Sequence, residues 1–316
     1  KAAKRLEEVV SHEASTIHRL LGFNGRTYSH DALNPIEADI LALDECSMID
    51  IPLAWRLFQA VDLKRTAVVL VGDHNQLPPV GPGNLLRDLV KARAIPTTVL
   101  TRIIRQGGEL KENSTTILAG QVRPTSELKI GSRRPWYVID KLTERDDLRR
   151  TLLRLFDEVL QERLGYDLIR DVQVMTPTHK GPLGTVELNV ALQRLLQKKL
   201  FQFDVPELEP GHRPRFYPGD KVIQTKNDYE LGVMNGAMGV VLDAQRDGGL
   251  SIDFDGRAVE IEPGSAALGN VQLAFVVSAH KAQGSEFPCA VVVVHKSHSF
   301  MHHRNLLYTA VTRAKE

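Results

Sequence analysis

Residues 39–45 read Asp39-Ile40-Leu41-Ala42-Leu43-Asp44-Glu45, an apolar run that ends in two adjacent carboxylates. A second apolar run, residues 67–71, ends in Gly72-Asp73, and residues 52–61 between the two runs have helical spacing. This order predicts two parallel strands joined by a crossover helix. In open α/β sheets, ligands bind just outside the carboxyl ends of the strands. The stretch therefore predicts an α/β fold with a ligand site around Asp44 and Glu45.

The same alternation of apolar runs and helical patterns continues along the chain. Further strands are expected at residues 97–100, 171–175, 273–278 and 290–295, and further helices at residues 146–164 and 185–200. A polar and basic stretch, residues 120–135, separates two groups of these elements. This order predicts two α/β domains with parallel sheets and a boundary near residue 120.

Residues 219–272 have a different pattern, with short alternating runs that are interrupted by glycine and aspartate. Within them, Asp253-Phe254-Asp255-Gly256-Arg257 is typical of a tight hairpin, because Asp-Gly favours a two-residue turn. We therefore expect a small antiparallel β-barrel that is inserted into the second α/β domain.

Composition excludes several classes of protein. The 316 residues carry a net charge of +1, with 42% hydrophobic and 25% charged residues, which is ordinary for a globular protein. The longest apolar runs are far too short to cross a bilayer, so we expect no membrane partner. Cys46 and Cys289 lie inside apolar runs and are expected to be buried thiols, and no metal-ligand spacing is present. A charge this close to zero neither supports nor excludes nucleic-acid binding.

Asp44 and Glu45 suit the chemistry of nucleotide hydrolysis. That reaction needs one carboxylate to hold Mg²⁺ and another group to position and polarise the attacking water. Asp44 fits the first role and Glu45 the second. The alternative is an ordinary strand end at which Asp44 caps a following helix.

The second apolar run leads into the polar loop Gly72-Asp73-His74-Asn75-Gln76-Leu77-Pro78-Pro79-Val80-Gly81. Gln76 is suited to contact a γ-phosphate or to orient the water, because an amide both donates and accepts hydrogen bonds. The alternative is a turn held by Pro78 and Pro79, in which the polar groups are incidental.

Together these loops resemble two motifs of superfamily 1 helicases. Asp44-Glu45-Cys46-Ser47-Met48 resembles motif II, and residues 72–81 resemble motif III. The remaining motifs follow in family order: residues 100–106 resemble motif IV, residues 176–185 the start of the second motor domain, residues 278–287 motif V and residues 307–314 motif VI. Six ordered matches identify the chain as similar to the RecD-like branch.

The resemblance implies a fold and an activity. The fold would be two RecA-like parallel-sheet motor domains, residues 1–120 and residues 121–218 with 273–316, with an SH3-like β-barrel at residues 219–272. A short strand-separating pin would lie near residues 22–35, although a plain loop fits that stretch as well. The activity would be that of a cytoplasmic, ATP- and Mg²⁺-dependent DNA helicase. It would move 5′ to 3′ on single-stranded DNA and unwind duplex junctions in repair and recombination, and the resemblance leaves nuclease partner subunits open.

The resemblance also implies roles for residues. At the nucleotide, Asp44 would bind Mg²⁺ and Arg105 and Arg313 would be arginine fingers; the other nucleotide contacts would be Glu45, Gln76, Gly284 and Glu286. Contacts to DNA would come from hydroxyl, amide and basic groups, namely Thr16, His18, Thr178, His179, Lys180, Asn235, Ser278, His280 and Lys281.

One departure from the family pattern affects the expected activity. The phosphate-binding loop Gly-x-x-x-x-Gly-Lys-Thr is absent, and residues 1–6 resemble the end of motif Ia, which follows that loop. We therefore expect a fragment that hydrolyses ATP poorly by itself. Two alternatives stay open, an ATPase-dead single-strand-binding module and the motor part of a conjugative relaxase. The intact set of Asp44, Glu45, Gln76, Arg105 and Arg313 favours the active helicase.

Overall fold

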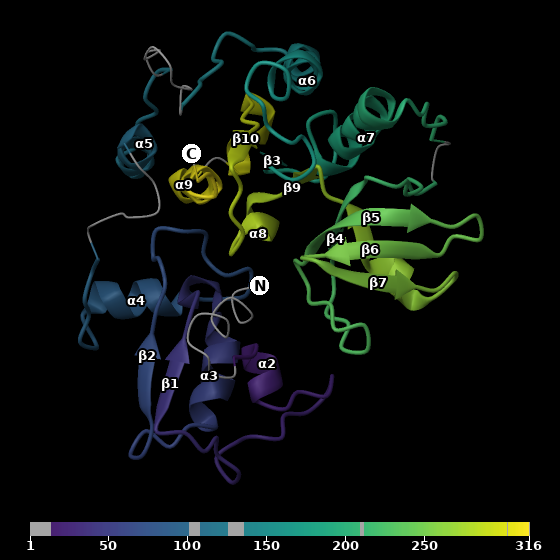
Figure 1. Cartoon of the computed structure of the whole chain (residues 1–316). Coiled ribbons are helices and arrows are strands. Elements are labelled where there is room, and N and C mark those ends of the chain that lie inside the picture. Colours follow the sequence, from purple (N-terminus) through teal and green to yellow (C-terminus); the bar gives the residue numbers. More distant parts are fainter. Residues whose placement is uncertain (1–13, 101–107, 126–135, 209–211, 302, 316) are drawn as a thin grey trace. The chain divides into compact units, whose positions relative to one another are not determined.

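The computed structural model describes residues 14–100, 108–125, 136–208, 212–301 and 303–315 (Figure 1). The chain forms two compact units, residues 1–102 and residues 103–316. Within the described ranges, no helix is long and apolar enough to cross a membrane.

The first unit contains the predicted strand–helix–strand unit. Strands β1 (Ile40–Leu43) and β2 (Ala67–Leu70) pair in parallel, and helix α3 (Ile51–Gln59) connects them (Figure 1). The helix begins at Asp50, whose carboxylate accepts the Leu53 N–H at 2.8 Å, and a proline occupies its first turn. The βαβ prediction is thus confirmed.

Short elements complete this unit: α2 (Ile17–Leu20), the 3-10 turn η1 (Cys46–Met48) and α4 (Leu85–Ala92). Its core combines buried side chains from β1, η1, α3 and α4 with Leu21, which directly follows α2; among them are Leu43, Cys46, Leu57 and Leu86. The apolar side chains of β1 and α3 therefore fix the loop that follows β1.

Two stretches of the first unit are irregular. The strand predicted at residues 97–100 is wrong, because Val99 and Leu100 are 58% and 88% exposed and form no strand. Residues 22–35 form a loop and not a hairpin of strands; the Asn24 N–H donates to the Thr27 carbonyl and the Asp31 N–H to the Asn34 carbonyl, each at 3.2 Å. Apolar composition alone does not make a strand where no neighbouring strand buries it.

The second unit has a parallel sheet in the order β10 (Cys289–Val292), β3 (Val172–Met175), β9 (Val276–Val277). Helix α7 (Thr185–Phe201) is fastened to it by Asn189, whose amide donates to the Val276 carbonyl at 2.7 Å and accepts the Val276 N–H at 2.9 Å. The predicted strand at 171–175 and helix at 185–200 are confirmed.

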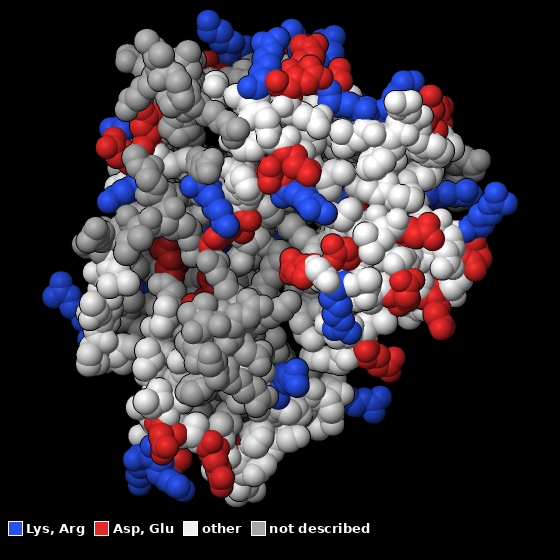
Figure 2. All heavy atoms as spheres, viewed as in Figure 1, with Lys and Arg blue, Asp and Glu red and all other residues white. Residues whose placement is uncertain are grey.

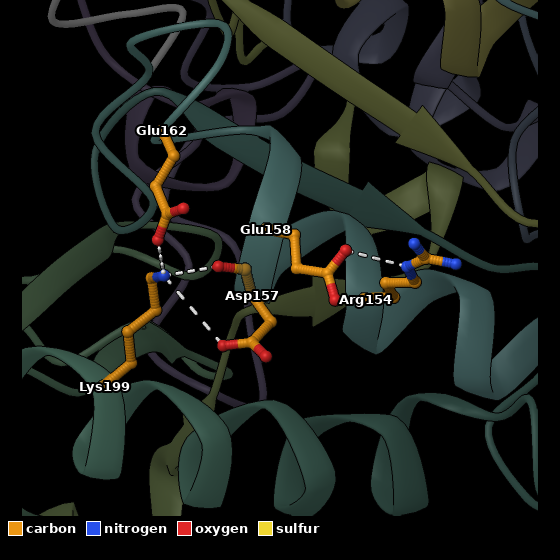
Figure 3. Close-up of polar contacts among 5 residues, drawn as sticks. All are labelled: Arg154, Asp157, Glu158, Glu162 and Lys199. Carbon is orange, nitrogen blue, oxygen red and sulfur yellow. Dashed lines mark hydrogen bonds and ion pairs between the residues drawn. The ribbon is translucent and has the colours of Figure 1, made fainter.

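The helix predicted at residues 146–164 is divided in two. It consists of α6 (Arg145–Arg154) and a π-helical turn, η2 (Leu155–Val159). Next to that turn, the Lys199 ammonium from α7 points at the Glu162 carboxylate, 2.7 Å away, and at Asp157 (Figure 3). The remaining helical elements are α5 (Gly108–Leu118), α8 (Ala279–Ala282), α9 (Arg304–Val311) and the 3-10 turns η3 (Ala266–Asn270) and η4 (Lys296–Met301).

A five-stranded antiparallel sheet is inserted between α7 and β9 of the second unit. Its order is β7-β6-β5-β4-β8, with β4 at Lys221–Gln224, β5 at Met238–Ala244, β6 at Leu250–Phe254, β7 at Arg257–Ile261 and β8 at Val271–Leu273. The β6–β7 turn has Asp255 and Gly256 at φ 53° and 84°, which confirms the predicted Asp-Gly hairpin. Within the described ranges β7 and β8 do not pair, so the sheet is open at these edges.

On the face drawn in Figure 2, the charges do not gather into one patch of a single sign. On the face shown in Figure 2, the coloured lysines and arginines are interspersed with aspartates and glutamates. This distribution agrees with the net charge of +1. Any polyanion would therefore have to be bound through local contacts and not through bulk attraction.

Candidate functional site

The carboxylate pair of the first unit lies directly after β1. The Asp44 Oδ1 accepts the Glu45 N–H at 2.8 Å, and Glu45 has the left-handed backbone angles φ 53° and ψ 39°. For a residue other than glycine, asparagine or aspartate that conformation is disfavoured. Such strain occurs preferentially at functional sites, where the surrounding structure holds it in place.

The loop after β2 is fastened beside this pair. The Cys46 N–H donates to the Val71 carbonyl at 2.9 Å. A Cβ added at Gly72 would lie 2.9 Å from Leu86 Cδ2 and 3.0 Å from the Cys46 nitrogen. The two loops thus approach each other so closely at Gly72 that only glycine fits without a shift.

A second glycine fixes the far end of the same loop. A Cβ at Gly81 would lie 1.9 Å from Asp50 Oδ2, the carboxylate that caps α3, and the Ile51 N–H donates to the Pro82 carbonyl at 3.0 Å. Gln76 lies between the two fastened ends and is half-buried. The structure therefore brings the loops of Asp44, Glu45 and Gln76 together, as the sequence predicts for neighbouring parallel strands.

The two cysteines are not candidates for nucleophiles. Burial raises the pKa of the Cys46 thiol to about 11 and that of Cys289 to about 11. Both are thiols at neutral pH; Cys46 is buried, as predicted, whereas Cys289 is half-buried. Within the described ranges no three histidine, cysteine or acidic side chains gather into a metal site. A metal at β1 would thus rely on Asp44 and on ligands from a bound molecule.

Thr16 and His18 lie at the short helix α2. The Thr16 hydroxyl accepts the Arg19 N–H at 3.3 Å and so caps α2, yet Thr16 remains exposed. The His18 ring packs edge-on against Phe23 at 5.6 Å between ring centres, and Phe23 packs on Tyr28 at 4.7 Å. His18 is therefore held by the aromatic side chains of the 22–35 loop.

In the second unit, the loop at residues 176–185 closes the end of β3 onto α7. The Thr178 hydroxyl lies 3.2 Å from His298 Nε2, and His179 Nδ1 lies 2.7 Å from the Thr185 hydroxyl. A Cβ at Gly184 would lie 2.6 Å from the Lys180 carbonyl, so the loop folds back tightly. His179 and Lys180 are exposed on it.

Ser278, His280 and Lys281 form the next candidate group, at α8. The Ser278 hydroxyl accepts the Lys281 N–H at 3.4 Å and caps this helix. Burial lowers the pKa of His280 and also the pKa of Lys281. The Lys281 ammonium donates to Gln272 Oε1 at 3.2 Å. Asn235 is exposed between β4 and β5, where its N–H donates to Asn227 Oδ1 at 2.9 Å.

Arg313 is buried, at 2% exposed. Its guanidinium donates to the Thr309 carbonyl at 3.1 Å, to the Ser285 carbonyl at 3.4 Å and to the Thr312 hydroxyl at 3.3 Å. One carboxylate oxygen of Glu286 lies 3.6 Å from the Lys315 ammonium. Gly284, Ser285 and Glu286 thus lie in one turn against the segment of Arg313. Arg105 lies outside the described residues.

Three family models match parts of the chain. They are an AAA domain over residues 1–82, an ATP-dependent RecD-like DNA helicase SH3 domain over residues 188–254 and a UvrD-like helicase C-terminal domain over residues 273–316. The ATP-dependent RecD2 DNA helicase of Deinococcus radiodurans is 38% identical over 318 residues, which cover 100% of this chain and 41% of that protein. Over its whole length the chain is thus similar to RecD-like helicases.

Other relatives of this RecD-like chain agree. The RecBCD enzyme subunit RecD of Mycobacterium tuberculosis is 30% identical over 344 residues, which cover 100% of this chain and 58% of that subunit. The chain therefore spans between 41% and 58% of the length of these two curated relatives.

Solved structures confirm the α/β helicase fold of the RecD-like chain. A Pif1 helicase from Bacteroides, in complex with ADP-AlF3 and single-stranded DNA, has a TM-score of 0.51 at 18% identity and covers 96% of this chain and 77% of its own. The Pif1 helicase from Candida albicans has a TM-score of 0.50 at 20% identity, with 89% and 71% covered. Together with the SH3 family model, this confirms the RecA-like fold with an SH3-like insertion.

Sequence reasoning missed three buried polar residues of the RecD-like chain. His298 holds the hydroxyl of Thr178, and it lies 120 residues away in sequence. Asp220 and Lys221 lie side by side at the entry to β4, 0% and 5% exposed. Adjacent opposite charges at the start of an apolar run were the available signal, but their partners on α7 and β3 are far away in sequence.

Proposed function

We propose that this RecD-like chain is the motor part of an ATP-dependent DNA helicase that translocates on single-stranded DNA. The observation that carries the proposal is the pair of loops after β1 and β2. There Asp44, the strained Glu45 and Gln76 are gathered at the carboxyl ends of neighbouring parallel strands. A strand-end carboxylate pair facing a polar loop suits the hydrolysis of a nucleoside triphosphate.

ATP and Mg²⁺ fit this donor set. Mg²⁺ commonly takes one or two carboxylates and completes its shell with water and phosphate oxygens. Asp44 is exposed and uses Oδ1 for the Glu45 N–H, so Oδ2 is placed for such a role. When bound, the metal would neutralise phosphate charge. In the proposal Glu45 accepts the proton of the attacking water and Gln76 orients that water.

The second unit would contribute Arg313, with Gly284 and Glu286 next to the nucleotide. Arg105 is proposed as a second arginine finger on the family motif alone. Three hydrogen bonds of Arg313 go to the neutral oxygens of Thr309, Ser285 and Thr312. An anionic γ-phosphate is a stronger acceptor than these oxygens, so it can compete for the guanidinium.

The DNA would contact exposed and half-buried groups at several loop and helix ends. These are Thr16 and His18 at α2, Thr178, His179 and Lys180 before α7, Asn235 on the inserted sheet, and Ser278, His280 and Lys281 at α8. Neutral hydroxyls and amides with few cations bind the backbone locally, which suits a surface of mixed charge (Figure 2). We further propose 5′-to-3′ movement, action at duplex junctions in repair and recombination, and a cytoplasmic location, as the family relationship suggests.

The direct test is ATP hydrolysis by the full-length protein with and without single-stranded oligonucleotide. A motor requires turnover that the oligonucleotide stimulates. A passive single-strand-binding module would bind the oligonucleotide in a fluorescence anisotropy titration and yet show no turnover with Mg²⁺ present. That second result would overturn the proposal.

A further inference from the structure

Lys221 is a buried lysine at the start of β4, where the inserted sheet meets the parallel sheet of the same unit. Its ammonium donates to the Val172 carbonyl at 3.0 Å, at the first residue of β3, and lies 5.3 Å from the centre of the Phe287 ring. Its own carbonyl accepts the Ala274 N–H at 2.7 Å. Burying an ammonium is costly unless its surroundings compensate it. The Val172 carbonyl and the face of the Phe287 ring provide such compensation. Through these two contacts Lys221 connects its own segment to that of Val172 and to that of Phe287.

Phe287 continues this connection to the segment of Arg313. The Phe287 N–H donates to the Arg313 carbonyl at 2.9 Å, and the Phe287 carbonyl accepts the Lys315 N–H at 2.9 Å. Phe287 also forms an isolated parallel bridge with Ala314 and is 5% exposed. The ring that contacts Lys221 and the backbone that pairs with residues 313–315 belong to one residue, so displacing the ring displaces both hydrogen bonds.

The residue before Lys221 prevents β4 from sliding freely. Asp220 accepts hydrogen bonds from Gln197 at 2.9 Å and from the Tyr217 N–H at 2.8 Å, and also from Gln193. Its carboxylate therefore anchors β4 to α7, while the Lys221 side chain reaches β3 and Phe287. This pair of buried side chains is therefore one connection between the inserted sheet and the parallel sheet, beside the chain segment that leads from β8 to β9.

We infer that Lys221 is a positioning residue that couples the inserted sheet to the segment carrying Arg313. The inference rests on the proposed function, in which the single-stranded DNA contacts the inserted β-sheet at Asn235 and Arg313 approaches the nucleotide. Loading of DNA on the sheet shifts β4, the ammonium shifts the Phe287 ring, and residues 313–315 follow. Lys221 itself touches neither DNA nor nucleotide.

The test compares Lys221→Met with Lys198→Met in the full-length protein. Methionine keeps an unbranched apolar side chain of similar length and removes the ammonium. Lys198 is the matched control, because it is largely exposed at the end of α7 and its ammonium pairs with Asp204 on the surface. Hydrogen exchange is followed in peptides that cover residues 284–289 and 311–315. We expect exchange to accelerate at least about fivefold in Lys221→Met and to stay unchanged in Lys198→Met.

Turnover provides the functional readout. Lys221→Met should lower the DNA-stimulated kcat for ATP about tenfold, while the DNA-free rate and the KM for ATP stay near the wild-type values. Unchanged exchange, or DNA stimulation equal to wild type, overturns the inference. If the wild-type protein shows no DNA-stimulated turnover, the proposed function fails and the exchange measurement still decides on Lys221. If Lys221→Met does not fold, Phe287→Leu should give the same exchange and turnover changes, and wild-type values there would contradict the coupling.

Discussion

At the scale of single residues, Glu45 carries the chemistry of the proposal. Its backbone is left-handed, and its N–H donates to the carboxylate of the adjacent Asp44. The motif predicts the carboxylate pair, but it cannot predict this conformation. The strain depends on Cys46 and Gly72, which hold the two loops together through contacts that are distant in sequence.

We expect Glu45→Gln to abolish ATP turnover in the full-length protein and to leave ATP binding intact. The amide keeps the shape of the side chain but cannot accept the proton of the attacking water. Steady-state hydrolysis and nucleotide binding by calorimetry measure the two effects, with the exposed Glu37→Gln as control. Hydrolysis within a few-fold of wild type would show that Glu45 is not the base.

Arg313 gives a second prediction at this scale. Arg313→Gln should lower ATP hydrolysis by about 10³-fold or more, because an amide cannot supply the charge of an arginine finger. Glutamine can still donate to the Thr309 carbonyl, so it preserves part of the buried bonding. DNA affinity without nucleotide should match that of Arg304→Gln. A large loss of DNA affinity in Arg313→Gln alone would place Arg313 on the DNA.

At the scale of elements, the sequence pattern correctly predicted those strands, helices and turns whose formation depends on residues close together in the chain. The runs at β1, β2 and β3, the helix α7 and the Asp-Gly hairpin all follow from periodicity or turn chemistry. Residues 97–100 have the same apolar character but lack a strand partner, and the 22–35 loop is organised by its aromatic contacts and not by strand pairing. Whether these two stretches form strands depends on the segments that pack against them, and the local sequence pattern does not identify those segments.

The anchor of β4 on α7 gives a pH-dependent prediction. Burial raises the pKa of Asp220 to about 6, although the hydrogen bonds from Gln197 and Gln193 act to lower it. The folded protein therefore binds this proton more tightly than the unfolded chain does. The contribution of Asp220 to stability is complete at low pH and declines as the pH rises towards 6, by roughly 3 kcal/mol in all.

Urea unfolding of wild type and Asp220→Asn isolates this effect. The asparagine does not titrate, so the difference in unfolding free energy between the two proteins should fall by roughly 2 kcal/mol from pH 4 to pH 7, because the unfolded carboxyl is already partly ionised at pH 4. At every pH the variant also lacks one acceptor for the glutamine amides. A difference that does not change with pH would show that Asp220 stays ionised throughout this range.

At the scale of the whole molecule, the motifs predicted the fold class and the similarity to RecD-like helicases, and their assignment of site residues stays a prediction. Motif order gave the RecD-like assignment, which the 38% identity to the Deinococcus radiodurans RecD2 helicase supports. Within the second unit, the buried links through His298, Asp220 and Lys221 join segments up to 120 residues apart. Such links are invisible to any local pattern, yet they hold the loops that the motifs identify.

In the proposed function, this chain drives movement along single-stranded DNA in the 5′-to-3′ direction. The most direct measurement is strand separation by the full-length protein with ATP and Mg²⁺ on two partial duplexes of identical sequence, one with a 5′ single-stranded tail and one with a 3′ tail. We expect unwinding of the 5′-tailed duplex, abolished by Glu45→Gln, and little unwinding of the 3′-tailed duplex. Preferential unwinding of the 3′-tailed duplex, or ATP-independent separation of either, would contradict it.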